Sequence, residues 1–160
     1  MEELPRQLPQ DDDSRFFRLI KLTYAKVQRP FEELFKGQLT ALELHVLCEL
    51  KVSGPMTVTE LSERLRIPKQ QMSKLVSKMA LAGNIVKKRT VLADKRSVRV
   101  EITDEISQMM SAKCLGYMDA IGKTLEDNGI DRMQFVAAVR FLTDILDRID
   151  EHHIPPQTNG

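Results

Sequence analysis

Basic and neutral polar side chains are concentrated between Thr57 and Thr103. From Arg64 to Arg99 the chain has eleven Lys and Arg residues against one acid, Asp94, a local balance of +10. The net charge of all 160 residues is +1, so the rest of the chain is acidic by −9. Positive charge segregated in this way predicts a surface that binds a polyanion.

The most specific chemistry in this segment lies on a predicted helix that starts at Pro68 or Lys69 and stops at Gly83. Its apolar face is formed by Met72, Leu75, Val76, Met79 and Ala82. The other face has amides, hydroxyls and lysines but no carboxylate: Lys69, Gln70, Gln71, Ser73, Lys74, Ser77 and Lys78. Glutamine can pair with adenine in the major groove, and lysine contacts phosphate or guanine. We therefore predict that this face binds DNA.

Two neighbouring elements would position that helix. Thr57-x-x-Glu60 has the form of a capping box and begins a short helix whose apolar residues are Leu61, Leu65 and Ile67. The two helices and the turn at Pro68 describe a helix-turn-helix. A strand from Ile85 to Arg89 and an alternating strand through Val98, Val100 and Ile102 then predict a hairpin. Such a wing can place an arginine in the minor groove.

Long amphipathic helices flank this part of the chain. We expect the first to be capped by Asp13 or Ser14 and disturbed at Pro30, which lacks an amide hydrogen. Its apolar positions, which favour packing on a partner subunit, are Phe16, Phe17, Ile20, Tyr24, Val27, Phe31, Leu34 and Phe35. A further helix begins at the capping box Thr40-x-x-Glu43 and ends at Ser53-Gly54-Pro55.

After the wing, Thr103 is expected to cap a long helix that ends at Asn128-Gly129. Asp131 then begins a last helix, whose faces are too apolar to be left in water: Met133, Val136, Val139, Leu142, Leu146 and Ile149. These faces predict that a partner covers them.

Several stretches resemble the MarR family of bacterial transcription regulators. They are the run from Leu39 to Leu47, Leu61-Ser62-Glu63-Arg64-Leu65, Met72-Ser73-Lys74-Leu75-Val76, Gly83-Asn84-Ile85-Val86 and, most specifically, the run from Asp94 to Thr103. This run is similar to the family's wing pattern, D-x-R followed by alternating apolar residues and a closing L/I-T. The resemblance spans about residues 14 to 150. The glycine that usually follows the pattern has no counterpart here, because Asp104 follows Thr103 directly.

The resemblance implies a mainly α fold with a small β wing: a winged helix-turn-helix domain plus N- and C-terminal dimerisation helices. We expect a flexible tail over 1–13, an N-terminal dimerisation helix over 14–38, the DNA-binding domain over 39–103, C-terminal dimerisation helices over 104–150 and a tail over 151–160. It also implies that residues 69–81 form the recognition helix and that Arg96, held by Asp94, enters the minor groove. Lys95 and Ser97 complete the expected wing contacts.

The function expected from these features is that of a sequence-specific regulator of transcription, a repressor, that binds a pseudo-palindromic site in double-stranded DNA as a homodimer. The resemblance further implies that a small lipophilic or phenolic effector releases it. A winged helix that binds protein partners and a redox- or metal-responsive regulator are the alternatives. Mixed charge on the recognition face would favour a protein partner, but the sequence has none there.

Other function classes find no support in the sequence. No catalytic motif is present and 160 residues leave no room for a catalytic part, so we expect neither an enzyme nor a cofactor. The longest apolar run is far shorter than the ~20 residues of a membrane span, and we expect a cytoplasmic protein. Cys48 and Cys114 are interpreted as two buried thiols, His45 as an ordinary polar residue, and His152-His153 as too nonspecific for a metal site.

Overall fold

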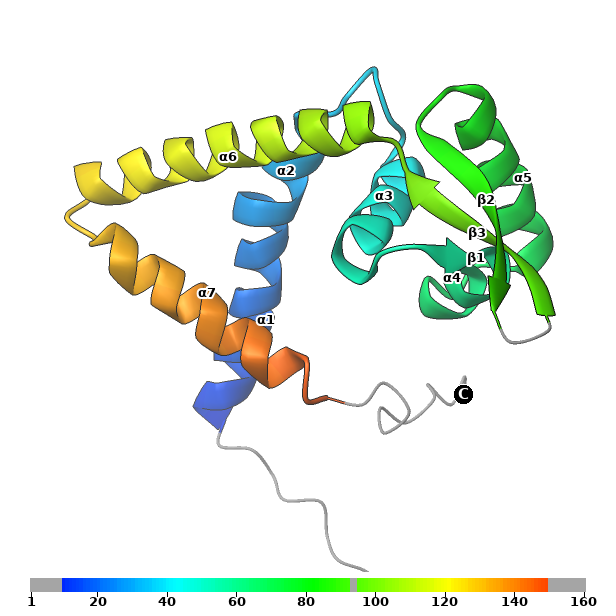
Figure 1. Cartoon of the computed structure of the whole chain (residues 1–160). Helices are drawn as coiled ribbons and strands as arrows, with labels where there is room; N and C mark the ends of the chain where they lie inside the picture. The colour runs from blue at the N-terminus through cyan, green and yellow to red at the C-terminus, as the bar shows by residue number, and fades with distance from the viewer. Residues whose placement is uncertain (1–9, 93–94, 150–160) are drawn as a thin grey trace, which may run out of the picture. The chain divides into compact units, whose positions relative to one another are not determined.

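The computed structural model describes the backbone of residues 10–92 and 95–149 and the side chains of residues 12–89 and 98–149. The chain forms two compact units, Met1–Cys114 and Leu115–Gly160. The long helix α6 (Asp104–Asp127) contributes to both. The described elements are mainly helical with one small antiparallel sheet, as Figure 1 shows, so the predicted fold class is confirmed.

The N-terminal helical region consists of α1 (Gln10–Thr23), a π-helical turn η1 (Tyr24–Gln28) and α2 (Arg29–Glu33). The predicted cap at Asp13 or Ser14 was wrong, because the helix already begins at Gln10. Negative side chains are favourable in a first turn, so the acidic run from residue 11 to 13 lies inside the helix. In η1 the amide of Arg29 donates to the carbonyl of Tyr24. The disturbance expected at Pro30 thus takes the form of a wide turn just before the proline.

Both predicted capping boxes are confirmed. In α3 (Ala41–Ser53) the amide of Thr40 donates to Glu43 Oε2 at 2.8 Å, and the amide of Glu43 donates to Thr40 Oγ1 at 3.3 Å. In α4 (Val58–Arg64) the amide of Thr57 donates to Glu60 Oε2 at 2.7 Å. Each box satisfies amide hydrogens that a helix start leaves free, and so fixes where the helix begins.

The helix α5 (Lys69–Leu81) follows α4 after a tight turn. Ser62 Oγ donates to the carbonyl of Ile67 at 2.7 Å, which closes that turn before Pro68. At the other end Gly83 has a φ of 77°, and the amide of Asn84 donates to the carbonyl of Met79 at 2.9 Å. This is the left-handed glycine termination expected from the sequence, so both ends of α5 were predicted correctly.

The sheet has the strand order β1-β3-β2 and is antiparallel throughout. β2 (Ile85–Leu92) and β3 (Lys95–Ile102) form the wing and are longer than predicted, so the apolar residues Val91 and Leu92 belong to a strand and not to its tip. β1 (Met56–Thr57), which was not predicted from the sequence, pairs with Val100 and Arg99. A strand of two residues that ends at the helix cap Thr57 is too short to show a strand period.

One apolar core joins these elements in the first unit. Its fully buried side chains come from α3, α4, α5 and the sheet: Val46, Leu47, Leu61, Met72, Val76, Met79 and Val100, with Phe35 from the turn after α2. The apolar face predicted for α5 is therefore the buried one, except that Ala82 is exposed. Because α5 has three fully buried anchors, its opposite face is held outward.

The hydroxyl of Thr103 connects the start of α6 to the end of α5. It donates to the carbonyl of Gly83 at 3.0 Å, while the carbonyl of Thr103 accepts the first amide bond of α6, from Ser107 at 2.9 Å. Thr103 therefore stands at the helix start, as predicted, and also closes the base of the wing.

The second unit comprises the end of α6 and α7 (Arg132–Leu146). Asp131 caps α7 as expected, since its carboxylate accepts the amide of Met133 at 3.0 Å. Arg132 pairs with Asp119 of α6 at 2.9 Å. No residue of α7 is buried.

The interpretation of both cysteines as buried thiols was wrong for Cys114, which is exposed. Cys48 is half-buried, and burial raises the pKa of its thiol, with a smaller contribution from Cys114. Both cysteines belong to helical apolar patterns, but the side of α6 on which Cys114 lies is exposed in the single chain.

Candidate nucleic-acid interface

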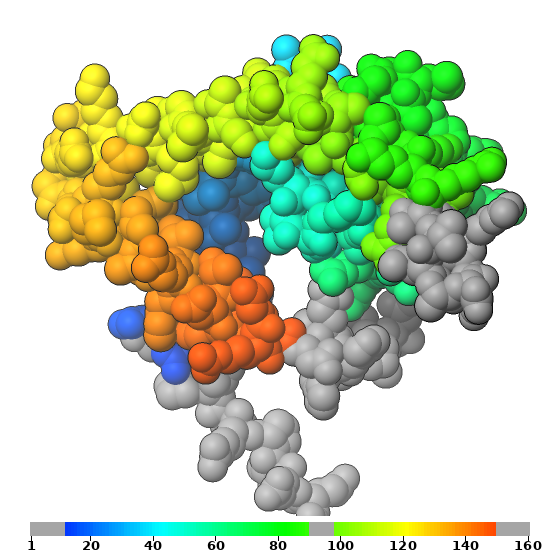
Figure 2. Space-filling view, viewed as in Figure 1, coloured from blue at the N-terminus to red at the C-terminus, as the bar shows by residue number. Residues whose placement is uncertain are grey.

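The outer face of α5 is formed by the residues predicted to contact DNA. Lys69, Gln70, Gln71, Ser73 and Lys74 are all exposed, whereas Met72, Val76 and Met79 between them are fully buried. Within the described residues neither Lys69 nor Lys74 has an ion-pair partner. The face therefore offers amide, hydroxyl and ammonium donors from a rigid helix. Figure 2 shows the green part of the chain, which includes α5 and β2, at the surface of the winged-helix unit.

The start of α5 adds a second feature that favours anions. Pro68 precedes the helix, and its first turn has no acidic residue. The first amides of a helix have no intrahelical acceptor and form the positive end of its dipole. A phosphate group near Lys69 would meet both these amides and the lysine ammonium.

The wing lies beside α5, as Figure 1 shows for β2. Ile85 at the start of β2 is buried, and Lys87, two residues on, donates from Nζ to Ser77 Oγ at 3.1 Å. Side chains alternate along a strand, so Arg89 shares the α5 side of the sheet with Lys87. Ser77 is half-buried and engaged by the wing, so it links the two elements.

The predicted wing contacts are only partly described. The register pairs Lys95 with Leu92, Arg96 with Val91 and Ser97 with Thr90. Asp94 and the side chains of Lys95, Arg96 and Ser97 lie outside the described part of the chain. The ion pair between Asp94 and Arg96, and the minor-groove contact of Arg96, therefore stay predictions.

Four other basic residues of the 64–99 segment are paired with glutamates that lie outside it. Arg64 is 3.0 Å from Glu49, Lys78 is 3.0 Å from Glu43, and Arg99 is 3.9 Å from Glu60. Lys88 pairs with Glu101, which raises the pKa of the Lys88 ammonium. The local balance of +10 thus overstates the free positive charge, because the fold brings acids from distant positions to these cations.

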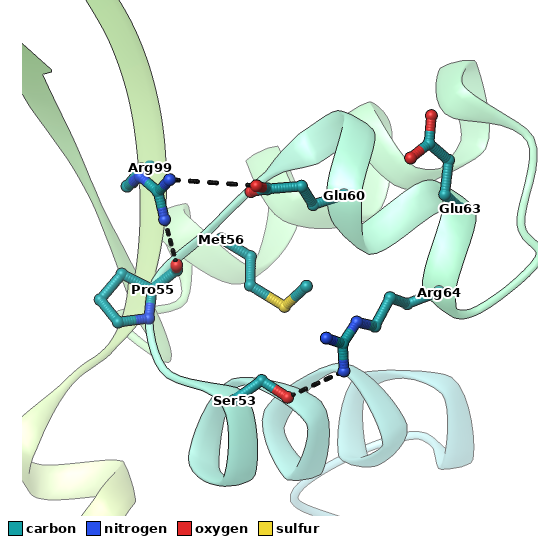
Figure 3. A pocket seen from close by; sticks show the side chains of 7 residues that line it. All are labelled: Ser53, Pro55, Met56, Glu60, Glu63, Arg64 and Arg99. Atoms are coloured by element: carbon teal, nitrogen blue, oxygen red, sulfur yellow. Dashed lines mark hydrogen bonds and ion pairs between the residues drawn. The ribbon is translucent and has the colours of Figure 1, made fainter. Parts of the chain in front are cut away.

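Arg99 shows what such pairing does for the fold. Figure 3 shows its guanidinium between the Pro55 carbonyl, which accepts from Nη1 at 2.7 Å, and Glu60. Its Nε is buried and has no hydrogen-bond partner among the described residues. Because Pro55 precedes β1 and Glu60 caps α4, Arg99 fastens the wing strand β3 to the start of the helix-turn-helix.

A shallow polar pocket adjoins Arg99. It is lined by Ser53, Pro55, Met56, Glu60, Glu63, Arg64 and Arg99. Arg64 is held there by Ser53 and Glu49 at 3.2 and 3.0 Å. With two arginines and two glutamates among its lining residues, the pocket has balanced charges.

Backbone hydrogen bonds dominate the electrostatics of the two capping glutamates. The amide of Thr40 holds the pKa of Glu43 below its usual value, and the Lys78 ammonium acts in the same direction. The amide of Thr57 likewise lowers the pKa of Glu60, with Arg99 and Arg64 contributing less. Both carboxylates are therefore charged at neutral pH.

Within the described residues, no group of three or more His, Cys, Asp and Glu side chains could hold a metal ion. His152-His153 lies outside the described part of the chain.

None of the helices described is both long and apolar enough to span a membrane.

The helix pair α4–α5, followed by the β2–β3 hairpin, defines a winged helix-turn-helix protein. The description of the family model that matches residues 38–97 is MarR family. This match covers the helix-turn-helix and the greater part of the wing. Residues 38–97 are therefore similar to the MarR family, and the structure folds them as a winged helix. None of the curated proteins compared with the sequence matches it.

Solved structures share the fold over most of the chain. A MarR family protein from Bacillus stearothermophilus is 17% identical and aligns over 88% of this chain and 96% of its own, with a TM-score of 0.71. The transcriptional regulator BldR from Sulfolobus solfataricus is 19% identical, aligns over 89% and 100%, and has a TM-score of 0.58. NadR in complex with 4-hydroxyphenylacetate is 16% identical, aligns over 94% and 100%, and has a TM-score of 0.57.

Proposed function

We propose that this protein is a transcriptional regulator that binds double-stranded DNA as a homodimer, with α5 in the major groove of each half-site. The observation that supports this best is the outer face of α5. Its lysines, glutamines and serine are exposed without a single carboxylate, on a helix fixed by buried Met72, Val76 and Met79. A protein-binding winged helix would be expected to mix charges on this face, so DNA is the favoured ligand.

The chemistry of each side chain on the outer face of α5 indicates which part of the DNA it would contact. Gln70 and Gln71 would read base edges, because an amide can donate to and accept from adenine at once. Lys69 and Lys74 would neutralise phosphates and fix the register. Arg96 of the wing would enter the adjacent minor groove, where the negative potential favours a guanidinium.

The homodimer is supported by large apolar side chains that the single chain leaves in water. Phe17 of α1 is 73% exposed and Phe141 of α7 is 69% exposed. Other exposed apolar side chains on the two helical regions are those of Phe16, Ile20, Tyr24, Met133, Val139, Leu142 and Leu146. Exposed apolar helix faces of this kind mark interaction sites in a monomer. We propose that a second copy covers the apolar faces of α1 and α7 and thereby spaces two α5 helices along the DNA.

Sedimentation tests the dimer. The wild-type chain is expected to be dimeric at micromolar concentration, and Phe17→Glu or Phe141→Glu should shift it to monomer. Val52→Glu is the matched control, because Val52 is also an exposed apolar residue but lies on α3 of the winged helix. A monomeric wild type would overturn this part of the proposal.

Repression and release by a small aromatic acid complete the proposal. The NadR structure named above contains 4-hydroxyphenylacetate, which supports a phenolic effector here. A thermal-shift and gel-shift panel of aromatic acids should identify a compound that stabilises the protein and weakens DNA binding. If no compound does either, the ligand-controlled part fails while the DNA-binding part stands.

DNA binding is tested by selecting bound duplexes from a random pool and measuring affinity by fluorescence anisotropy. We expect a pseudo-palindromic site with half-sites about one helical turn apart. Arg96→Ala should weaken binding by ~1–3 kcal/mol, and Gln70→Ala or Gln71→Ala should relax the base preference. Lys123→Ala on α6 is the control for a lost positive charge. No enrichment of any duplex would overturn the proposal.

A further inference from the structure

Glu43 has an unusual position for a carboxylate. Of the residues whose side chains the structure describes, it is the one charged residue that is buried, at 6% exposure. Both of its oxygens are occupied: Oε2 accepts from the amide and the hydroxyl of Thr40 at 2.8 and 3.0 Å, and Oε1 lies 3.0 Å from Lys78 Nζ. A single buried side chain therefore fastens the start of α3 to the third turn of α5.

The partner of Glu43 was counted among the residues expected to contact DNA. The side chain of Lys78 is 67% exposed along its length, but its ammonium ends at the buried carboxylate. Loss of the Lys78 ammonium would leave the buried Oε1 of Glu43 without this cation, so the contact resists being exchanged for another partner. To reach a phosphate, Lys78 would have to abandon Glu43.

The contact between Lys78 and Glu43 bears on how α5 is oriented. Lys78 follows Gln71 by seven residues, which places the two on nearly the same side of the helix about two turns apart. The buried Met72, Val76 and Met79 already restrain the rotation of α5 about its own axis, and the attachment of Lys78 to α3 restrains it further at the third turn. Small rotations of α5 would move the Gln70 and Gln71 amides relative to base edges.

We propose that Lys78 is a positioning residue that refines the rotation of α5 through buried Glu43, and that it does not serve as a phosphate contact. This inference rests on the proposed DNA-binding function. It assigns selectivity between sequences to an ion pair that lies away from the bases, and it leaves the charge contacts to Lys69 and Lys74.

A double-mutant cycle tests the proposal with Lys78→Met, Glu43→Gln and the two combined, and with Lys74→Met as the matched control on the same helix. Affinity is measured for the selected duplex and for a random duplex at several salt concentrations. A phosphate contact contributes about one unit to the slope of log affinity against log salt, so Lys74→Met should reduce the slope by about one. Lys78→Met should leave the slope unchanged.

Selectivity, the ratio of the two affinities, is the second readout. Lys78→Met and Glu43→Gln should each lower it by roughly tenfold, and the combined variant should lower it no further, because residues in contact are not additive. Glu43→Gln is decisive, since removal of a negative charge would by charge alone strengthen DNA binding. Lys78→Arg should restore part of the selectivity.

Three results would overturn the proposal. They are a slope reduced by about one in Lys78→Met with selectivity intact, unchanged selectivity in Glu43→Gln, or additive losses in the combined variant. Thermal unfolding without DNA separates this inference from the proposed function. If the wild type binds no duplex, the function fails, and coupling between the two substitutions in Tm still supports the anchoring of α5, while additive shifts reject it.

Discussion

The outer face of α5 and the residues around its edge use the same basic side chains in opposite ways. On α5, Lys69 and Lys74 are exposed without an ion-pair partner among the described residues. Around that face, cations reach glutamates of other elements, as Arg64 does with Glu49 and Arg99 with Glu60. The difference indicates that only part of the basic segment is available to DNA, while the rest holds the winged helix together.

The largest expected effect is a loss of stability on shortening a buried side chain of α5. The core beneath α5 holds both its outer face and the paired cations around that face in place. Met72 is fully buried beneath the α5 face. Met72→Ala should lower the free energy of unfolding by ~2–5 kcal/mol, because it removes buried methylenes and leaves a cavity. Urea denaturation measures this loss, and Leu81→Ala on the exposed side of α5 is the control. A loss below 1 kcal/mol would contradict the described core.

The next effect distinguishes the two groups directly. Lys69→Ala and Lys74→Ala should each weaken binding of the selected duplex by about 1–3 kcal/mol and leave the unfolding midpoint unchanged. These lysines have no role in the described fold, so only the DNA loses a partner. Anisotropy and thermal unfolding on the same samples provide both quantities. If either variant lost stability and kept its affinity, that lysine would belong with the paired cations that stabilise the fold and not with the DNA-binding residues.

The contribution of the capping residue Glu60 to stability can be tested by changing the pH. Glu60→Ala removes the acceptor of the Thr57 amide and should cost about 1 kcal/mol of stability. Glu60→Gln retains an oxygen acceptor but cannot titrate. The pKa of Glu60 is lowered in the folded state from its ordinary value of 4.5. Its contribution to stability is therefore fully present above that value and is lost as the pH falls through the folded pKa.

Unfolding midpoints measured from pH 7 down to pH 3 check this. The acid loss of stability should be smaller in Glu60→Gln than in the wild type, and Glu63→Gln, on the same helix, is the control. Identical acid profiles for wild type and Glu60→Gln would show that the Thr57 amide does not stabilise the charged carboxylate.

The smallest effect is expected at Lys88. Its pair with Glu101 lies on the surface, where water and salt screen the interaction. Lys88→Ala should change neither Tm nor the salt dependence of DNA binding measurably. A lost phosphate contact, seen as a slope reduced by about one, would move Lys88 into the DNA-binding group.

Sequence patterns predicted the local features of this fold well. The boxes Thr40-x-x-Glu43 and Thr57-x-x-Glu60, the proline before α5 and the glycine after it fixed element ends, since each acts through bonds within a few residues. The outer face of α5 was likewise predictable from helical spacing. Strand alternation predicted the wing hairpin, and the family resemblance assigned the expected contacts of Asp94 and Arg96.

The missed features depend on distant parts of the chain. Glu43 and Lys78 are 35 positions apart, and nothing in either local pattern indicates that they meet. Arg99 was counted as one more basic residue, although its partner Glu60 and the unpredicted strand β1 make it an internal fastener. Charge counted along a sequence cannot distinguish a free cation from a paired one, because pairing is decided by tertiary packing.

The salt dependence of binding to the selected duplex tests the central claim most directly. We expect the wild-type affinity to fall steeply with salt, since lysines on α5 displace counterions from the phosphates. Lys74→Ala should flatten that dependence by about one unit of slope, and Lys88→Ala should follow the wild type. A flat wild-type response, or equal changes in both variants, would contradict the assignment of the outer face of α5 as the DNA-binding surface.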